Sequence, residues 1–175
     1  FRGPWYYEMS DLGYNYRITD LQCALGLSQL AKLDHFVSRR RALARRYDEA
    51  LAEELLCNHL RPLLQLDDRR NSYHLYVVQV RPREGDNTED LARRRKSLFG
   101  FLADRQIFCQ VHYIPVPWHP YYRGIELPVS IEWPGAEAYY ASSLSLPLYA
   151  ALEGDGQERV IQVMVDWCLD IPKVG

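Results

Sequence analysis

The chain has 175 residues, of which 47% are hydrophobic, and its formal net charge is −2. That length makes one moderate domain, or one domain with an appendage, and the composition excludes intrinsic disorder. The nearly neutral charge gives no global field that would attract nucleic acid or a membrane surface. No apolar run approaches the ~18 residues that a membrane span requires. The first ten residues do not read as a signal peptide, and we therefore expect a protein with no membrane partner and no nucleic-acid partner.

The four cysteines lie far apart in the sequence, and none forms a Cys-x-x-Cys pair. Their spacing therefore matches neither a zinc site nor a small disulfide-stapled scaffold. We interpret them as ordinary buried thiols of a cytoplasmic protein. They are Cys23, Cys57, Cys109 and Cys168.

The first 56 residues predict an irregular segment followed by two helices. Residues 1–18 are rich in Gly, Tyr and Trp, and Thr19 or Asp20 is a suitable N-cap for the apolar stretch that continues to Leu33. That first helix is apolar over much of its surface, so it should be buried on more than one side. A second, amphipathic helix should follow from Asp34 to about residue 56.

The remainder of the chain alternates short strands with helices. We predict strands at 72–80, 107–113 and 145–149, and helices at 88–105, 135–143 and 155–169. A loop rich in proline and aromatic residues, 115–134, is long enough to suggest a functional role. The pattern favours an α+β fold, with a small sheet of about three strands, antiparallel or mixed, and helices on one face.

Two arginine-rich clusters lie on the predicted helices, at 39–46 and 93–95. We interpret both as solvated helix faces. A nucleic-acid surface would be expected to interleave aromatic residues and to be basic overall, and this chain shows neither feature.

Asn15 and Arg17 lie in a Gly-Tyr-Asn-Tyr-Arg loop directly before the first predicted helix. Free backbone amides at a helix start and a nearby guanidinium suit an anion such as a phosphate. The residues alone are equally typical of an Asn-stabilised turn with a structural ion pair. His112, at the end of a predicted strand, is similarly ambiguous between proton chemistry and simple packing.

The run Asp11-Leu12-Gly13-Tyr14-Asn15-Tyr16-Arg17-Ile18-Thr19-Asp20 and the ten residues after it resemble a segment of the DegT/DnrJ/EryC1/StrS sugar aminotransferases. Val111-His112-Tyr113-Ile114-Pro115 and Pro120-Tyr121-Tyr122 resemble a second stretch of that family, near the mouth of its active site. The closest similarity is to the members that aminate a UDP-linked 4-keto-6-deoxy-N-acetylhexosamine on the way to pseudaminic acid.

This resemblance implies a protein that uses pyridoxal 5'-phosphate (PLP) on a fold-type-I aminotransferase scaffold. Glutamate would be the amino donor, a nucleotide sugar the acceptor, and the enzyme a homodimer. Asn15 would reach the PLP phosphate of the other subunit, with Arg17 beside it as a second cofactor contact. His112, Tyr113 and Tyr121 would contact the substrate.

The resemblance also implies that the chain is the C-terminal part of such an enzyme. Residues 1–56 would link to a PLP domain outside this chain, and 57–175 would form the small C-terminal domain. The chain's lysines, Lys32, Lys96 and Lys173, do not match the family's Schiff-base motif, so we expect no catalytic residue and no activity from the chain alone.

Two other functions remain open from the sequence. One is a PLP-dependent sugar dehydratase of the same superfamily, in which a histidine outside this chain replaces the lysine. The other is a non-catalytic module that dimerises through helix 20–33 or binds an anionic polymer through its arginine clusters.

Overall fold

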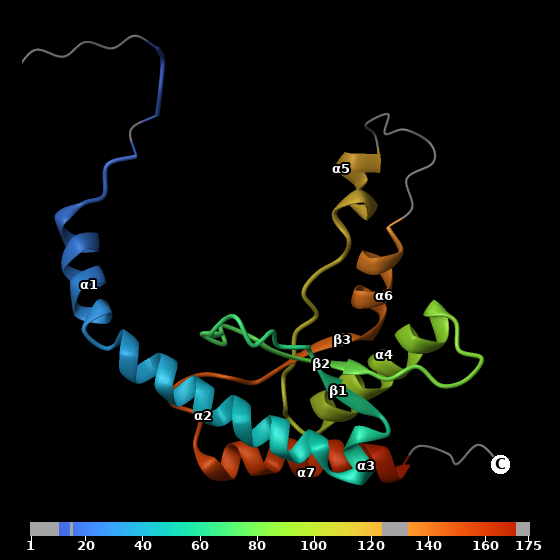
Figure 1. Ribbon diagram of the computed structural model, residues 1–175. Helices are drawn as coiled ribbons and strands as arrows, with labels where there is room; N and C mark the ends of the chain where they lie inside the picture. Colours follow the sequence, from blue (N-terminus) through green and yellow to red (C-terminus); the bar gives the residue numbers. More distant parts are fainter. Residues whose placement is uncertain (1–10, 15, 124–132, 171–175) are drawn as a thin grey trace, which may run out of the picture. The chain divides into compact units, whose positions relative to one another are not determined.

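A computed structural model of the chain describes residues 11–14, 16–123 and 133–170. The chain divides into two compact units, Phe1–Asp34 and His35–Gly175. The described part confirms the predicted α+β class, with helices and one small antiparallel sheet (Figure 1). None of the helices in these ranges is both long and apolar enough to cross a membrane.

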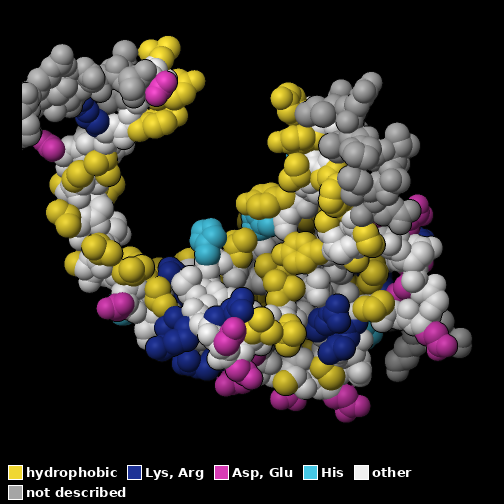
Figure 2. Space-filling view, turned by 45° about the horizontal axis from the view of Figure 1, so that its top comes forward, with side chains coloured by type: hydrophobic (Ala, Val, Ile, Leu, Met, Phe, Trp, Pro, Cys, Tyr) yellow, Lys and Arg dark blue, Asp and Glu magenta, His cyan; other side chains and the backbone are white. Residues whose placement is uncertain are grey.

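Helix α1 (Asp20–Leu30) is the regular element of the first unit. Thr19 is its N-cap, one of the two residues predicted, and forms a capping box: the Gln22 backbone N–H donates to Thr19 Oγ1 (3.3 Å), and Gln22 Oε1 accepts from the Thr19 N–H (2.9 Å). Its leucines remain exposed within this chain, Leu21 by 82% and Leu27 by 69%. Figure 2 shows hydrophobic side chains on this helix. The prediction that α1 is buried on more than one side is wrong for this chain, since none of its residues is buried.

The second unit is built on a three-stranded antiparallel sheet in the order β1-β2-β3. The strands are β1 (Leu60–Pro62), β2 (Tyr76–Val80) and β3 (Ser143–Leu146). Leu60 faces Val80 across the first pair, and Tyr76 faces Leu146 across the second. The number of strands agrees with the prediction.

In the described part of the second unit, six helices and one 3₁₀ turn surround the sheet. They are α2 (Leu33–Ala52), α3 (Glu54–Cys57), α4 (Thr88–Asp104), η1 (Val116–Trp118), α5 (Pro120–Arg123), α6 (Pro134–Ser142) and α7 (Gly154–Asp170). Helices α2 and α7 run side by side along one face of the sheet, and α5 and α6 rise on the other side (Figure 1). The buried Gln157 side chain of α7 donates to the Leu43 carbonyl of α2 at 2.7 Å, which joins the two helices directly.

The core follows from the alternation of strand residues. Tyr76, Val78 and Val80 point to the helical side and are at most 3% exposed. They meet fully buried side chains of the helices, which include Tyr47, Leu98, Leu102 and Met164. The other side of β3 carries Ser143 and Ser145, which are buried although polar.

The prediction of a strand over residues 107–113 was wrong. This segment pairs with the sheet only at Gln110, which exchanges two backbone hydrogen bonds with Ser145 (3.2 and 2.8 Å). In that register the next hydrogen-bonded pair would join Phe108 to Pro147, and proline has no N–H to donate. The third strand is instead β1, a three-residue edge strand too short to give an alternating pattern.

Helix α2 uses its arginines to hold two neighbouring loops. Four of them donate to backbone carbonyls: Arg39 to Leu152 (2.8 Å), Arg40 to Ser72 (3.0 Å), Arg41 to Asn71 (2.7 Å) and Arg46 to Gly154 (3.0 Å). The interpretation of this cluster as simply solvated is therefore wrong. Hydrophobic periodicity identified the helix but could not show which carbonyls its polar side would meet.

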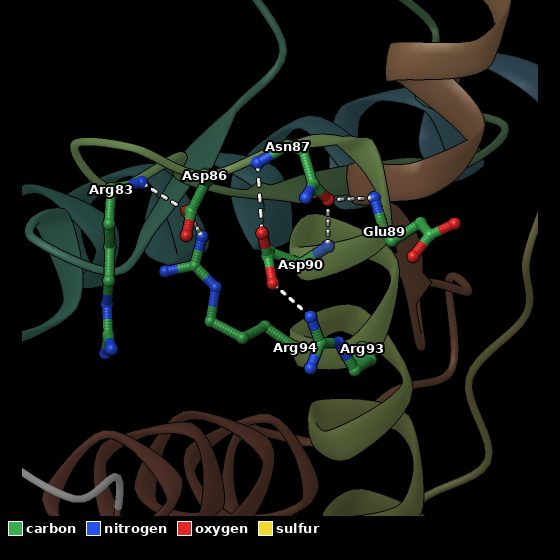
Figure 3. A network of polar contacts seen from close by, with 7 residues as sticks. All are labelled: Arg83, Asp86, Asn87, Glu89, Asp90, Arg93 and Arg94. Atoms are coloured by element: carbon green, nitrogen blue, oxygen red, sulfur yellow. Dashed lines mark hydrogen bonds and ion pairs between the residues drawn. The ribbon is translucent and has the colours of Figure 1, made fainter.

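The loop before α4 is held by a second polar network (Figure 3). Asn87 caps the helix by accepting from the N–H groups of Glu89 (2.8 Å) and Asp90 (3.0 Å), and the Asp90 carboxylate in turn accepts from the Asn87 N–H (3.1 Å). The Asp86 carboxylate accepts from the Arg83 N–H at 2.5 Å and also pairs with Arg94. Burial lowers the pKa of Arg94, and the Asp86 charge opposes that shift.

Candidate functional site

The two predicted cofactor contacts belong to the first unit. Asn15 lies outside the described residues. Arg17 lies in the exposed segment that leads into α1, two residues before the Thr19 cap. The rings of Tyr14 and Tyr16, on either side of position 15, contact each other with centroids 5.5 Å apart. The cofactor roles of Asn15 and Arg17 stay predictions.

His112 lies at the edge of the sheet in the second unit. The backbone bridge between Gln110 and Ser145 brings the chain alongside β3 two residues earlier. From there the His112 ring turns toward the strand, and its Nδ1 lies 2.8 Å from Ser145 Oγ. Ser145 is 5% exposed, whereas His112 is half-buried. The ring is thus anchored on one side and accessible on the other.

Tyr113 follows His112 in the chain and extends this site toward solvent. Its ring meets the edge of the His112 ring at a centroid distance of 4.5 Å, and its side chain is 71% exposed. Ile114 and Val116 are also exposed, by 46% and 58%. Figure 2 shows hydrophobic side chains gathered along this part of the second unit. A surface of exposed aromatic and aliphatic side chains beside an oriented histidine is suited to binding a ligand.

The loop that follows Tyr113 is held by an aromatic stack on the helices behind it. Trp118 of η1 packs edge-on against Tyr140 of α6, with centroids 5.7 Å apart. The Arg95 guanidinium of α4 lies over the same Tyr140 ring at 5.2 Å. The second arginine cluster therefore contributes to the support of this loop, a role that its sequence did not indicate.

Tyr121 is placed apart from the two other predicted substrate residues. It lies on the short helix α5, is 75% exposed, and contacts the ring of Tyr122 at 5.1 Å. Within the described residues no hydrogen bond or ring contact joins it to His112. The structure thus brings His112 and Tyr113 together, and the substrate roles of all three residues stay predictions.

Two grooves on the second unit were not predicted from the sequence. One, of about 890 Å³, follows β1 and is lined by residues that include Asp48, Arg61, Gln79 and Arg81. The other, of about 340 Å³, shares Arg61 and Gln79 and reaches Tyr139 and Ser142 of α6. No sequence signal marked these positions, because the lining residues come from several elements that are far apart in the chain.

Asp48 is the ionisable group at the boundary between the core and the larger groove. Its carboxylate accepts a hydrogen bond of 2.5 Å from the buried hydroxyl of Tyr76. Burial raises the pKa of Asp48, and the hydrogen bond from Tyr76 opposes that shift. This arrangement can bind a small polar group.

The lysines among the described residues do not line either groove. Lys32 lies between α1 and α2, and Lys96 lies on α4, where both are exposed. Lys173 lies outside the described residues. An amine that forms a Schiff base is normally desolvated or placed beside another cation, and neither exposed lysine has a desolvated setting.

The fold defines the second unit as a small α+β domain in which helices pack against a three-stranded antiparallel sheet. The model of the DegT/DnrJ/EryC1/StrS aminotransferase family matches residues 2–165. The chain therefore belongs to this family, as the sequence motifs predicted.

Known relatives agree with this assignment. The chain is 37% identical to the spore coat polysaccharide biosynthesis protein SpsC of Bacillus subtilis, over 94% of this chain and 40% of SpsC. It is 32% identical to a UDP-4-amino-4,6-dideoxy-N-acetyl-beta-L-altrosamine transaminase of Campylobacter jejuni, over 83% of this chain and 35% of that enzyme. The chain thus spans less than half the length of these relatives.

A solved structure supports the same fold. Spr1654 of Streptococcus pneumoniae in its PLP form superposes on 94% of this chain with a TM-score of 0.77 and 26% identity, although this covers only 39% of Spr1654. The same protein has also been solved with PMP. The predicted resemblance to a domain of aminotransferases is confirmed.

Proposed function

We propose that the chain is the C-terminal part of a PLP-dependent nucleotide-sugar aminotransferase. Its substrates would be glutamate as amino donor and a 4-keto-6-deoxy sugar as acceptor. The family match over residues 2–165 carries this proposal. The named activity of the Campylobacter jejuni relative supports the sugar class, and the PLP and PMP forms of Spr1654 support the cofactor.

The residues of the first unit fit one part of this cofactor. A guanidinium such as that of Arg17 pairs with a phosphate bidentately, and Arg17 stands in an exposed segment ahead of a capped helix. The exposed Lys32 and Lys96 do not fit the Schiff-base position. We therefore assign Asn15 and Arg17 to the PLP phosphate, across the interface of a homodimer, and no residue of this chain to the Schiff base.

When bound, PLP supplies the electron sink that allows an amino group to move between an amino acid and a ketone. The chain's own contribution would be to bind and orient the substrate. His112 would donate or accept a hydrogen bond at its outward side, and Tyr113 and Tyr121 would offer ring surface and hydroxyl groups. Residues 57–175 would act as the small domain, with residues 1–56 linking it to the PLP domain in a cytoplasmic enzyme.

Borohydride reduction after incubation with PLP tests the assignment of the Schiff base. We expect the purified chain to show no borohydride-trapped PLP on a specific lysine when its peptides are analysed by mass spectrometry. Stoichiometric trapping on Lys32, Lys96 or Lys173 would overturn the proposal that the chemistry resides outside this chain. A Lys96→Arg variant is the matched control for non-specific modification of exposed amines.

A further inference from the structure

The contact between His112 and Ser145 fixes the position of the ring and also bears on which ring nitrogen carries the proton. Ser145 lies on β3 and is 5% exposed, so its hydroxyl needs a hydrogen-bond partner within the protein rather than from solvent. Within the described part of the chain, the hydrogen-bond partner of that hydroxyl is His112 Nδ1, at 2.8 Å. A buried hydroxyl proton needs an acceptor, and Nδ1 can accept only when it carries no proton.

The backbone makes this contact difficult to rearrange. Gln110 and Ser145 exchange two main-chain hydrogen bonds, so the segment and β3 cannot slide past each other without breaking both. The His112 ring is further restricted by the edge contact with the Tyr113 ring at 4.5 Å. Both the place of the ring and the partner of Nδ1 are therefore set before any ligand binds.

We infer that Ser145 is a positioning residue that holds His112 in the neutral tautomer with its proton on Nε2. Nδ1 faces the buried serine, which leaves Nε2 as the ring nitrogen of this half-buried side chain that can meet a ligand. His112 then presents a single hydrogen-bond donor to an oxygen acceptor of the substrate. This inference deepens the proposed function, because it names the group through which the His112 site would recognise a sugar nucleotide: one of its oxygen acceptors.

Nitrogen-15 NMR of the chain's histidines tests the tautomer directly, because protonated and bare ring nitrogens resonate far apart. The chain has five histidines, and the His112 signals are identified by their loss in a His112→Asn variant. In the neutral ring we expect a bare Nδ1 and a protonated Nε2. A protonated Nδ1 in the unmodified chain would overturn the inference.

Three variants separate this role from a general effect on folding. Ser145→Ala should lower the ratio of the two tautomers by about fivefold, the equilibrium factor of one net hydrogen bond, while Ser145→Thr keeps the hydroxyl and should restore it. Ser143→Ala is the matched control, because Ser143 is equally buried on the same face of β3 but accepts from Gln79 at 3.3 Å. An unchanged tautomer ratio in Ser145→Ala, or the same change in Ser143→Ala, would contradict the inference.

The outcome is independent of the proposed function. The tautomer is measured without PLP or substrate, so a negative result would remove the role of Ser145 and leave the aminotransferase proposal untouched. Conversely, if His112 shows the expected tautomer but the protein transfers no amino group, only the proposed function is contradicted.

Discussion

Replacing Asp86 should destabilise the chain strongly, because it leaves a buried arginine without its partner. The side chains of Arg94 and Asp86 are only 16% and 15% exposed. Breaking a buried ion pair from one side costs about 3–5 kcal/mol. Asp86→Ala also removes the acceptor of the Arg83 N–H. The remaining exposure admits some water, so we expect the lower end, about 3 kcal/mol.

Urea unfolding followed by circular dichroism measures this change. With an m-value of about 2 kcal/mol/M, typical of a small domain, the midpoint should fall by ~1.5 M. Asp68→Ala is the matched control: Asp68 also pairs with an arginine, Arg69, but both side chains are more than 60% exposed. We expect no measurable change in its midpoint, since such surface pairs contribute little.

A double variant distinguishes loss of the pair from loss of packing. Asp86→Leu with Arg94→Met removes both charges and should be more stable than Asp86→Ala, because no unpaired charge remains buried. If Asp86→Ala stays within about 0.5 kcal/mol of the unmodified chain, the range of ordinary surface substitutions, then the network of Figure 3 does not hold the α4 loop as argued.

Three further outcomes follow from the packing and the ionisable groups. Leu98→Ala, at a fully buried position of α4, should lower the free energy of unfolding by about 2–5 kcal/mol in the same urea assay, through a cavity that cannot collapse. Burial raises the pKa of Asp48, so the folded state binds this proton more tightly and loses stability as pH rises from ~4 through the raised pKa. Asp48→Asn should therefore flatten that part of the curve of stability against pH, and an unchanged curve would contradict the cause given. Burial raises the pKa values of Cys109 and Cys168 to about 12. At pH 8 a thiol reagent should therefore label the partly exposed Cys23 and Cys57 first. Equal labelling of all four cysteines would refute this.

The helices could be predicted because local sequence determines their ends. Thr19 with Gln22 forms a capping box, and Asn87 with Asp90 forms another, and each pair lies within one helical turn in the sequence. The amphipathic pattern of α7 likewise extends over its full length. Such short-range signals need no knowledge of the partner surface.

The sheet was only partly predictable, because strand pairing depends on distant residues. The segment 107–113 has the composition of a strand, yet it forms only one bridge, between Gln110 and Ser145, and Pro147 directly after β3 cannot donate to it. In contrast, β1 is three residues long and carries Pro62, so it gave no strand pattern. Its place is decided by pairing with β2, which the sequence of β1 does not encode.

The candidate site was predictable as a set of residues but not as an arrangement. The motif around His112 indicated a functional residue, whereas its partner Ser145 is 33 positions away and lies in a stretch that we predicted only as a strand. Arg95 and Tyr140 support the same loop through ring contacts that no motif marks. Long-range side-chain contacts of this kind require the fold.

Amino transfer by a chimera, here called the joined protein, tests the central claim most directly. In the joined protein, this chain replaces the matching part of the Campylobacter jejuni transaminase, and the PLP domain is that of the transaminase. We predict that the joined protein releases 2-oxoglutarate from glutamate when PLP and the keto sugar nucleotide are present, that Asn15→Ala abolishes most of this release, and that the 175-residue chain alone releases none. A joined protein that melts cooperatively and binds PLP, yet transfers no amino group, would contradict the account, as would transfer by the chain alone.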